Sequence, residues 1–453
     1  MRAATLRAVP FEVATALFVA LSLSYIDINL RLRGRLALGA SDLYLALLIF
    51  ATAGTLLRAA WSAHARSRLV ALYTGHRAII LPLIGIAVFA FISALLPTAH
   101  WDQGAYFPML PIYDAIVVLL AMLIPVDERR RCHLRWYIGI AFLILLGSIG
   151  VDVVQPGTFS MVEFRAAGFA TNPNVAAFVL VSLCCAMISF DQVRVIDLGA
   201  VLLTGLGVLA TLSRAGALLF AFLLACYCYR AVQTSQVKLS RLVVRLVGIG
   251  SMVAVAAAAG VALVRQAAVF QLPSSRLSML FGRTPVLPAD DPRAAVFAES
   301  WRLIREAPLL GHGGGYSNRV AGEFWEGPHN VYLQQWINGG LGGLVCIVWL
   351  LVASASVFFR RRSYSGMVFT GLAAIQGFFS HSLLDERAFL FLLGVLLTTS
   401  YFAAPGAARL RRVAVAGRSF ARAPSATRPH AVAVDGMPSR SGSPRQGNTR
   451  LSP

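Results

Sequence analysis

The chain has 453 residues, of which 57% are hydrophobic and 13% charged, and its mean hydropathy is +0.70. These values exclude an ordinary soluble domain, in which the apolar share is lower. The formal net charge is +20, but no segment resembles a base-reading module. The basic residues gather in short segments between apolar stretches, so the charge indicates membrane topology and contact with anionic lipid headgroups, not nucleic-acid binding.

About twelve apolar segments are each long enough to cross the ~30 Å hydrocarbon core of a bilayer as a helix. Backbone groups find no water in lipid, so segments this apolar form helices. The sequence therefore predicts an all-α polytopic membrane protein with one long extracytoplasmic loop. The predicted spans are 11–30, 38–57, 78–97, 107–125, 136–154, 174–190, 195–212, 215–230, 243–264, 330–358, 366–382 and 388–404.

The first apolar segment follows Arg2 and Arg7 and resembles a secretory signal, but no convincing small-residue cleavage site follows it. We therefore expect a retained anchor. Most Arg and Lys fall in cytoplasmic segments if both termini lie inside, which is the distribution that the positive-inside rule favours. The cluster 31–35 is the exception, because this topology places its three arginines outside.

This topology divides the chain into four parts. Residues 1–264 form an N-terminal transmembrane block of about nine helices, and residues 329–404 form a C-terminal block of about three. Between them, residues 265–328 form the extracytoplasmic loop. Residues 405–453 are rich in Arg, Pro, Ser and Gly, a composition that cannot bury a core, so we expect a disordered basic cytoplasmic tail.

The extracytoplasmic loop contains one predicted amphipathic helix, which we expect to lie along the outer rim of the membrane. Asp290-Asp291-Pro292 is typical of a helix start, because a capping carboxylate precedes a proline in the first turn. One face carries an apolar stripe, interpreted as a packing surface and not as a ligand site: Ala294, Phe297, Trp301 and Ile304. The other faces carry Arg293, Ser300, Arg302, Arg305 and Glu306.

A glycine-rich stretch, Gly311–Tyr316, and then Gly327-Pro328-His329-Asn330 end this loop where a span begins. An ionisable group at the junction of membrane and water is a functional candidate, which favours His329 as part of a site. The alternative is that the glycines cap a short loop helix and His329 is a polar anchor at the interface.

Three arginines share the outer side with His329 under this topology: Arg165, Arg214 and Arg293. The planar guanidinium is always charged and suits phosphate oxygens. Arg214 lies in a tight turn between two spans, where desolvation is costly unless an anion meets it; the alternative is a side chain that snorkels to water. A neutral His can accept a proton from an attacking hydroxyl while arginines stabilise an anionic leaving group such as pyrophosphate.

A divalent metal is the usual alternative for handling pyrophosphate. The two outer acidic pairs are otherwise explained: Asp290-Asp291 as the helix cap and Asp385-Glu386 as a solvated turn beside Arg387. The sequence therefore predicts no metal and no cofactor.

Other polar residues are secondary candidates for positioning a substrate. Asn330 adjoins His329, and His381 with Asp385 follows a span on the outer side. His312, which we expect to be exposed among glycines, is a second candidate for the base. Asp114 lies within a span and either lines a cavity or is a hydrogen-bonded structural residue. Other acidic residues at span ends, Asp27 and Asp152, need no function.

Taken in order, these motifs resemble the O-antigen ligase and polymerase superfamily of bacterial envelope glycosyltransferases. The matching segments are Arg165-x-x-Gly168 with Asn172-Pro173-Asn174, Ser213–Gly216, Arg293, Pro308–Gly313, His329-Asn330-x-Tyr332-Leu333 and Gly339–Leu344. The chain departs from the family pattern in having His312 where a small aliphatic residue is frequent, Phe297 where Trp is frequent, and almost no Lys.

The resemblance implies a glycan donor on undecaprenyl pyrophosphate, held by Arg165, Arg214 and Arg293, with His329 activating the acceptor hydroxyl. It also implies inversion at the anomeric carbon, no metal, and a bacterial inner-membrane enzyme whose site faces the periplasm. The acceptor would be lipid A-core in a ligase, or a growing O-antigen or exopolysaccharide chain in a polymerase. A third hypothesis, from another class, is a lipid-carrier flippase; a transporter would show repeated halves with broken helices near the midplane.

Overall fold

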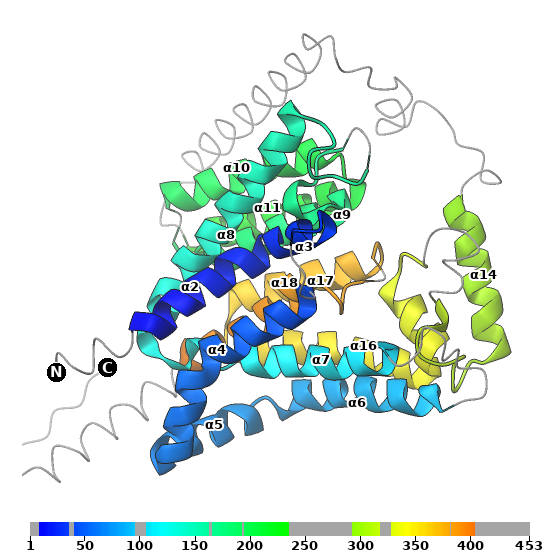
Figure 1. Cartoon of the computed structure of the whole chain (residues 1–453), viewed down its shortest axis with the longest axis horizontal. Helices are drawn as coiled ribbons and strands as arrows, with labels where there is room; N and C mark the ends of the chain where they lie inside the picture. Colours follow the sequence, from blue (N-terminus) through cyan, green and yellow to red (C-terminus); the bar gives the residue numbers. More distant parts are fainter. Residues whose placement is uncertain are drawn as a thin grey trace, which may run out of the picture. The chain divides into compact units, whose positions relative to one another are not determined.

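The computed structural model describes residues 9–35, 40–95, 106–162, 165–192, 194–234, 292–317, 328–380 and 382–403. Within these ranges all regular structure is helical, as predicted, and every predicted span that falls there coincides with a helix or with a bent helix pair (Figure 1). Several predictions lie outside the described residues: the span 243–264, the helix cap Asp290-Asp291, His381 and the tail 405–453.

The helices follow one another along the chain with short connections. Their bounds are α2 Val9–Leu23, α3 Ile26–Leu32, α4 Ala40–Trp61, α5 Ala63–Thr74, α6 Arg77–Ala94, α7 Tyr106–Ala121, η2 Ile124–Val126, α8 Glu128–Val154, η3 Gly168–Ala170, α9 Pro173–Met187, α10 Val195–Thr211, α11 Arg214–Thr234, α14 Pro292–Glu306, α16 Val331–Arg360, α17 Tyr364–Gly377 and α18 Arg387–Ala403.

Four of the described helices, α4, α8, α11 and α16, are long and apolar enough to cross a membrane, and the number is up to six if each of two bent pairs is one span. The pairs are α2 with α3, bent by 59°, and α5 with α6, bent by 71°. The shorter apolar helices include α9, α10 and α18. The chain is therefore a multi-pass helical protein, and the number of about twelve spans stays a prediction.

One bend includes a helix that the hydropathy pattern did not predict. Helix α5 lies in a basic segment that we expected to be a loop, and its N-cap Ser62 accepts a hydrogen bond from the backbone N–H of Ala65 at 3.3 Å. Its polar composition hides it from a search for apolar spans, while the cap and one buried face, with Leu69 and Leu72, stabilise it.

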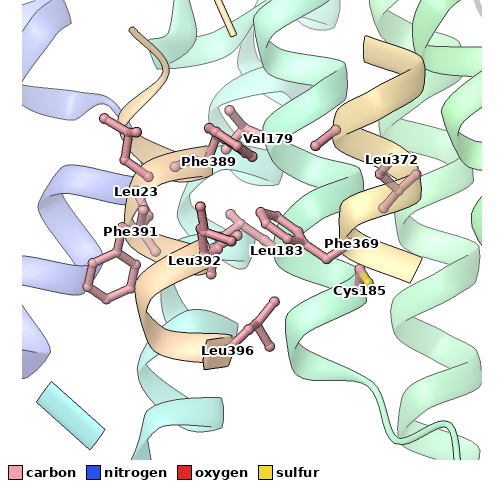
Figure 2. Close-up of a cluster of buried hydrophobic side chains, with 14 of the residues drawn as sticks. Leu23, Val179, Leu183, Cys185, Phe369, Leu372, Phe389, Phe391, Leu392 and Leu396 are labelled. Carbon is pink, nitrogen blue, oxygen red and sulfur yellow. The ribbon is translucent and has the colours of Figure 1, made fainter. Parts of the chain in front are cut away.

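Helices α9 and α18 form the centre of the core. Helix α9 packs against α8, α10, α11, α17 and α18, and most residues of both helices are buried. A helix that is apolar on all sides is stable only when surrounded by other elements or by lipid. Figure 2 shows side chains of both helices meeting those of α2 and α17, and Phe389 stacks on Phe369 with ring centroids 5.9 Å apart.

The arginines predicted to be cytoplasmic lie at one end of this helical unit. Arg361, just after α16, donates hydrogen bonds to the carbonyls of Gly75 and Leu397, both at 3.1 Å. In the same way, Arg58 at the end of α4 pairs with Asp127 before α8 at 3.0 Å. This grouping agrees with the predicted alternation of helix directions, and the assignment of this end to the cytoplasm stays a prediction.

Candidate functional site

Arg165 and the turn that carries Arg214 lie together, joined by hydrogen bonds. The Arg165 Nε donates to the carbonyl of Thr211 at 3.0 Å, and its Nη2 donates to Asn174 Oδ1 at 3.0 Å. The Ser213 hydroxyl donates to that same Oδ1 at 2.8 Å. Three elements therefore meet here: the segment before η3, the first turn of α9, and the junction of α10 with α11. Arg214 is exposed in the first turn of α11.

The segment that presents Arg165 is held by a buried carboxylate at the end of α8. Asp152 Oδ1 accepts the N–H of Phe159 at 2.6 Å, and Oδ2 accepts those of Ala167 and Gly168 at 3.1 and 2.8 Å. A Cβ on Gly168, whose φ is +55°, would lie 2.2 Å from the Ser148 hydroxyl, so this close approach requires glycine. Asp152 thus has a structural role that we did not expect from its position.

His329 lies immediately before α16 and is half-buried. Its φ is 47°, a left-handed conformation that is uncommon for a non-glycine residue and is often maintained at functional sites. The following residue, Asn330, is the N-cap of α16: its Oδ1 accepts the N–H groups of Tyr332 and Leu333 at 2.9 and 3.1 Å. The side-chain oxygen that we considered for substrate contact therefore stabilises the helix start that orients His329.

The glycine-rich loop forms backbone hydrogen bonds with α16 at a break in that helix. Gly340 has φ 61° and ψ −157°, which interrupts the helix. The loop backbone satisfies groups that this break leaves unpaired: His312 N–H donates to the Ile337 carbonyl at 2.8 Å, Gly313 N–H to the Asn338 carbonyl at 3.1 Å, and Leu341 N–H to the Pro308 carbonyl at 3.0 Å. The loop is therefore a structural partner of α16, which fits its lack of a phosphate-loop context.

The prediction that His312 is exposed is wrong. Its side chain is buried, its Nε2 lies 2.8 Å from the carbonyl of Leu303, and its ring stacks on Tyr316 at 4.5 Å. The surrounding glycines suggested exposure, but they bring the loop backbone so close to α16 and α14 that the ring is enclosed. Because a carbonyl can only accept, Nε2 carries a proton and is not the basic nitrogen.

We expect His312→Ala to reduce stability by about 1–2 kcal/mol, through loss of the hydrogen bond and the ring contact. His312→Gln, which can donate to the same carbonyl, should recover part of this loss. Thermal unfolding of the purified variants measures the effect. A normal melting temperature combined with abolished activity in both variants would contradict a structural role.

Helix α14 confirms the predicted amphipathic helix but changes its buried face. Val296, Ser300, Leu303 and Ile304 are buried, and the last two pack on Leu333 and Ile337 of α16. The Ser300 hydroxyl is satisfied within the helix by the carbonyl of Val296 at 2.7 Å, so a polar residue can occupy the buried face.

The aromatic residues of the predicted apolar stripe lie at the edge of this interface. Phe297 is 51% exposed and Trp301 is 37% exposed, and Trp301 contacts Trp336 edge-to-face with centroids 5.7 Å apart. Exposed aromatic rings are typical of a membrane–water interface. Arg293 lies in the first turn of this helix.

The interpretation of Asp385-Glu386 as a solvated turn is wrong for Glu386 and its neighbour Arg387, which are both buried. Arg387 forms a bidentate ion pair with Asp27 at 2.6 and 3.0 Å. Glu386 accepts hydrogen bonds from the hydroxyls of Tyr25 and Ser382 at 2.6 and 3.2 Å. Burial raises the pKa of the Glu386 carboxyl, and these hydrogen bonds oppose the rise. Asp27 lies in α3 and Tyr25 is its N-cap, both far away in sequence, so local composition could not reveal these two partners.

Asp114 lies in α7 and is buried, and one of its carboxylate oxygens has no hydrogen-bond partner among the described residues. Asp385 lies close enough to Asp114 for the two carboxyl groups to interact electrostatically. Asp114 therefore faces the turn before α18. His381, which precedes that turn, lies outside the described residues.

A chain of contacts places His329 at the same end of the helical unit as Arg165. From the start of α16, the Tyr332 hydroxyl donates to the Ala374 carbonyl near the end of α17 at 2.9 Å. The turn after α17 leads to Arg387, which pairs with Asp27 of α3. Arg33, after α3, donates to the carbonyl of Thr158 and lies over the ring of Phe159 at 5.0 Å, within the segment that leads to Arg165.

The electrostatics of this end suit an anion. Arg165 and Arg214 lie beside the N-termini of α9 and α11, and His329 lies at the N-terminus of α16. Helix N-termini carry partial positive charge and point backbone N–H groups outward, so they reinforce guanidinium groups in attracting phosphate oxygens. The arrangement places cationic groups and one imidazole at a common end of the helical unit.

Residues 199–348 match the O-antigen ligase family. The chain carries an O-antigen ligase domain. The domain runs from within α10 to the middle of α16, so it includes Arg214, Arg293, His312, His329 and the Gly340 break. No curated protein matches the chain significantly.

Members of the O-antigen ligase family are glycosyltransferase-like enzymes of the ligase and polymerase type, and the family implies polysaccharide and lipid-linked substrates in general. Arg165 and Asn174 lie outside the matched residues, yet their hydrogen bonds reach the Ser213–Arg214 turn inside them. The hydrogen-bonded cluster around Arg165 and the Arg214 turn therefore extends beyond the matched residues.

Sequence reasoning assigned no role to Asn174, Ser213 or Asn338. Asn174 and Ser213 lie in the motifs that carried the family resemblance, next to Arg165 and Arg214. Their place in those motifs was the one indication in the sequence that they belong to the site. Asn338, whose Oδ1 accepts the Ser317 N–H at 3.0 Å, had none.

Proposed function

We propose that this protein is an inner-membrane glycosyltransferase of the O-antigen ligase type. It transfers a glycan from undecaprenyl pyrophosphate to a hydroxyl of lipid A-core at the periplasmic face, with both chain termini in the cytoplasm. The observation that carries the proposal is the O-antigen ligase domain, whose Arg214 turn is hydrogen-bonded to Arg165 through Asn174.

In the proposed reaction Arg165, Arg214 and Arg293 bind the pyrophosphate, and His329 accepts the proton of the attacking hydroxyl. The acceptor oxygen forms a bond to the anomeric carbon as the bond from that carbon to the phosphate oxygen breaks. The electron pair leaves with undecaprenyl pyrophosphate, where the arginines stabilise the charge. Attack opposite the leaving group inverts the anomeric centre, and the cationic side chains do the work that a metal does elsewhere.

Transfer by purified protein tests this proposal, with undecaprenyl-pyrophosphate glycan as donor, lipid A-core as acceptor and EDTA present. We expect His329→Ala to reduce the rate by about 10²–10⁴-fold, as expected for loss of a general base. Arg214→Ala should cost about 10²–10³-fold through lost electrostatic stabilisation. Arg360→Ala is a matched control, because Arg360 ends α16 far along the helix from His329.

The identity of the acceptor distinguishes a ligase from a polymerase. Transfer to lipid A-core supports the ligase, and transfer only to a carrier-linked glycan supports a polymerase of O-antigen or exopolysaccharide. Full activity of His329→Ala would remove His329 as the base. Folded wild-type protein that binds the lipid but transfers to no acceptor would favour a flippase.

A further inference from the structure

We propose that Asn174 is a positioning residue that joins Arg165 and Arg214 into one pyrophosphate-binding unit while adding no negative charge of its own. This inference rests on the proposed function. Asn174 lies in the first turn of α9, between the segment that carries Arg165 and the turn that carries Arg214.

A single amide oxygen makes the connection. Asn174 Oδ1 accepts the Arg165 Nη2 at 3.0 Å and the Ser213 hydroxyl at 2.8 Å, and an amide oxygen has two lone pairs, so it meets both donors. Arg165 Nε is held in addition by the Thr211 carbonyl at 3.0 Å. Two bonds to a planar group set its orientation as well as its position.

The Arg214 side of the connection is equally defined. The Ser213 hydroxyl accepts the N–H of Gly216 at 3.0 Å and so caps α11, in which Arg214 is the first residue. A Cβ on Gly216 would lie 2.5 Å from the Cβ of Ala177, so the first turn of α11 is pressed closely against α9. Movement of Asn174 therefore affects the orientation of Arg165 and the start of α11 together.

The chemistry of this residue is informative. An aspartate would offer the same acceptor geometry and would pair more strongly with Arg165, but its charge would offset the attraction for an anion. A neutral amide orients the guanidinium without reducing the positive charge beside two helix N-termini. This choice suits a site that must bind a doubly charged group and is not needed for a merely structural contact.

The test is Asn174→Asp, assayed for transfer and for thermal unfolding in the same preparation. We expect kcat/KM to fall by about tenfold or more, mainly through KM for the lipid-linked donor, while the melting temperature stays equal or rises. If Asn174 only stabilised the fold, kcat/KM would not fall while the melting temperature is maintained, because both hydrogen bonds survive in the aspartate variant.

Asn172→Asp is the matched control. Asn172 is exposed two residues earlier and caps α9 by accepting the Asn174 N–H at 2.9 Å. It adds the same charge nearby at a position where aspartate is also a good cap, so we expect near wild-type transfer. Equal losses in both variants would overturn the assignment in favour of a general charge effect.

Ser213→Ala provides a second route if Asn174→Asp does not fold. It removes one donor to Asn174 and should reduce kcat/KM severalfold, and Ser213→Thr, which keeps the hydroxyl, should restore it. Wild-type transfer together with full activity of Asn174→Asp or Ser213→Ala would overturn this inference alone. Absence of transfer by the wild-type protein would instead overturn the proposed function.

Discussion

Gly340→Ala is expected to separate α16 from the glycine-rich loop and to destabilise the protein by about 3–5 kcal/mol. With φ 61° and ψ −157°, Gly340 occupies a backbone region that is essentially restricted to glycine. An added Cβ would lie 2.1 Å from the Leu309 carbonyl oxygen, and backbone atoms cannot rotate aside as a flexible side chain can. Relief of this clash would also disrupt the hydrogen bonds between the loop and the broken helix.

Gly339→Ala is the matched control for this experiment, because the nearest atom to its added Cβ is the Phe89 Cβ at 3.7 Å, an ordinary contact. Thermal unfolding and the yield of monodisperse protein in detergent would compare the two variants. We expect Gly339→Ala to behave like the wild type. Equal stability of both variants would show that the break at Gly340 is not required for the native packing of α16.

The helical architecture could be predicted because lipid offers the backbone no hydrogen-bond partners, which excludes irregular structure in apolar segments. A long apolar segment can satisfy its backbone only as a helix, so composition alone located α4, α8, α16 and the other apolar helices. Hydropathy does not reveal a helix break that leaves a segment equally apolar, nor a helix that forms in a polar segment. The break at Gly340 falls within one uniformly apolar segment, and α5 falls within a polar one. Both depend on contacts with residues that are distant in sequence.

The candidate site was accessible from the sequence only in outline. Alternation of span direction correctly predicted that Arg165 and the Arg214 turn lie at one end of the helical unit, because helices joined by short loops run antiparallel. It could not predict that Asn174 joins them, because a hydrogen bond depends on side-chain geometry and not on topology. His312 illustrates the opposite error: glycine neighbours suggested an exposed loop, whereas they allow the backbone to approach closely enough to bury the ring.

The contacts of α16 with the glycine-rich loop and with α14 bear on the proposed function because they hold the helix that follows His329. This residue is followed by the Asn330 cap, and the first turns of α16 then pack on α14 through Leu333 and Ile337. The loop that follows α14 is in turn bonded to the broken part of α16. Helix α14, whose first turn carries Arg293, and the helix that follows His329 are thus held as one unit, so the two residues proposed to bind pyrophosphate and to accept the proton lie on connected elements.

Arg387→Ala and Asp27→Ala are each expected to destabilise the protein by about 3–5 kcal/mol. The two side chains form a bidentate ion pair in which each is only 7% exposed. The guanidinium also lies 5.2 and 5.0 Å from the ring centroids of Tyr25 and Tyr44. Removing either partner leaves the other charge buried without its counter-ion, and this desolvation penalty is larger than the net stabilisation that the intact pair provides.

A double variant distinguishes this account from simple loss of packing. In Asp27→Leu with Arg387→Met both charges disappear and apolar volume remains, so we expect the double variant to be more stable than either alanine variant. Arg58→Ala is the control: its ion pair with Asp127 has a similar 3.0 Å distance, but Arg58 is 60% exposed, so its loss should cost no more than about 1 kcal/mol. Thermal unfolding in detergent measures all four variants. A double variant that loses as much stability as the two alanine variants together would mean that Arg387 and Asp27 contribute independently, and the bend between α2 and α3 would then have to be stabilised by other contacts.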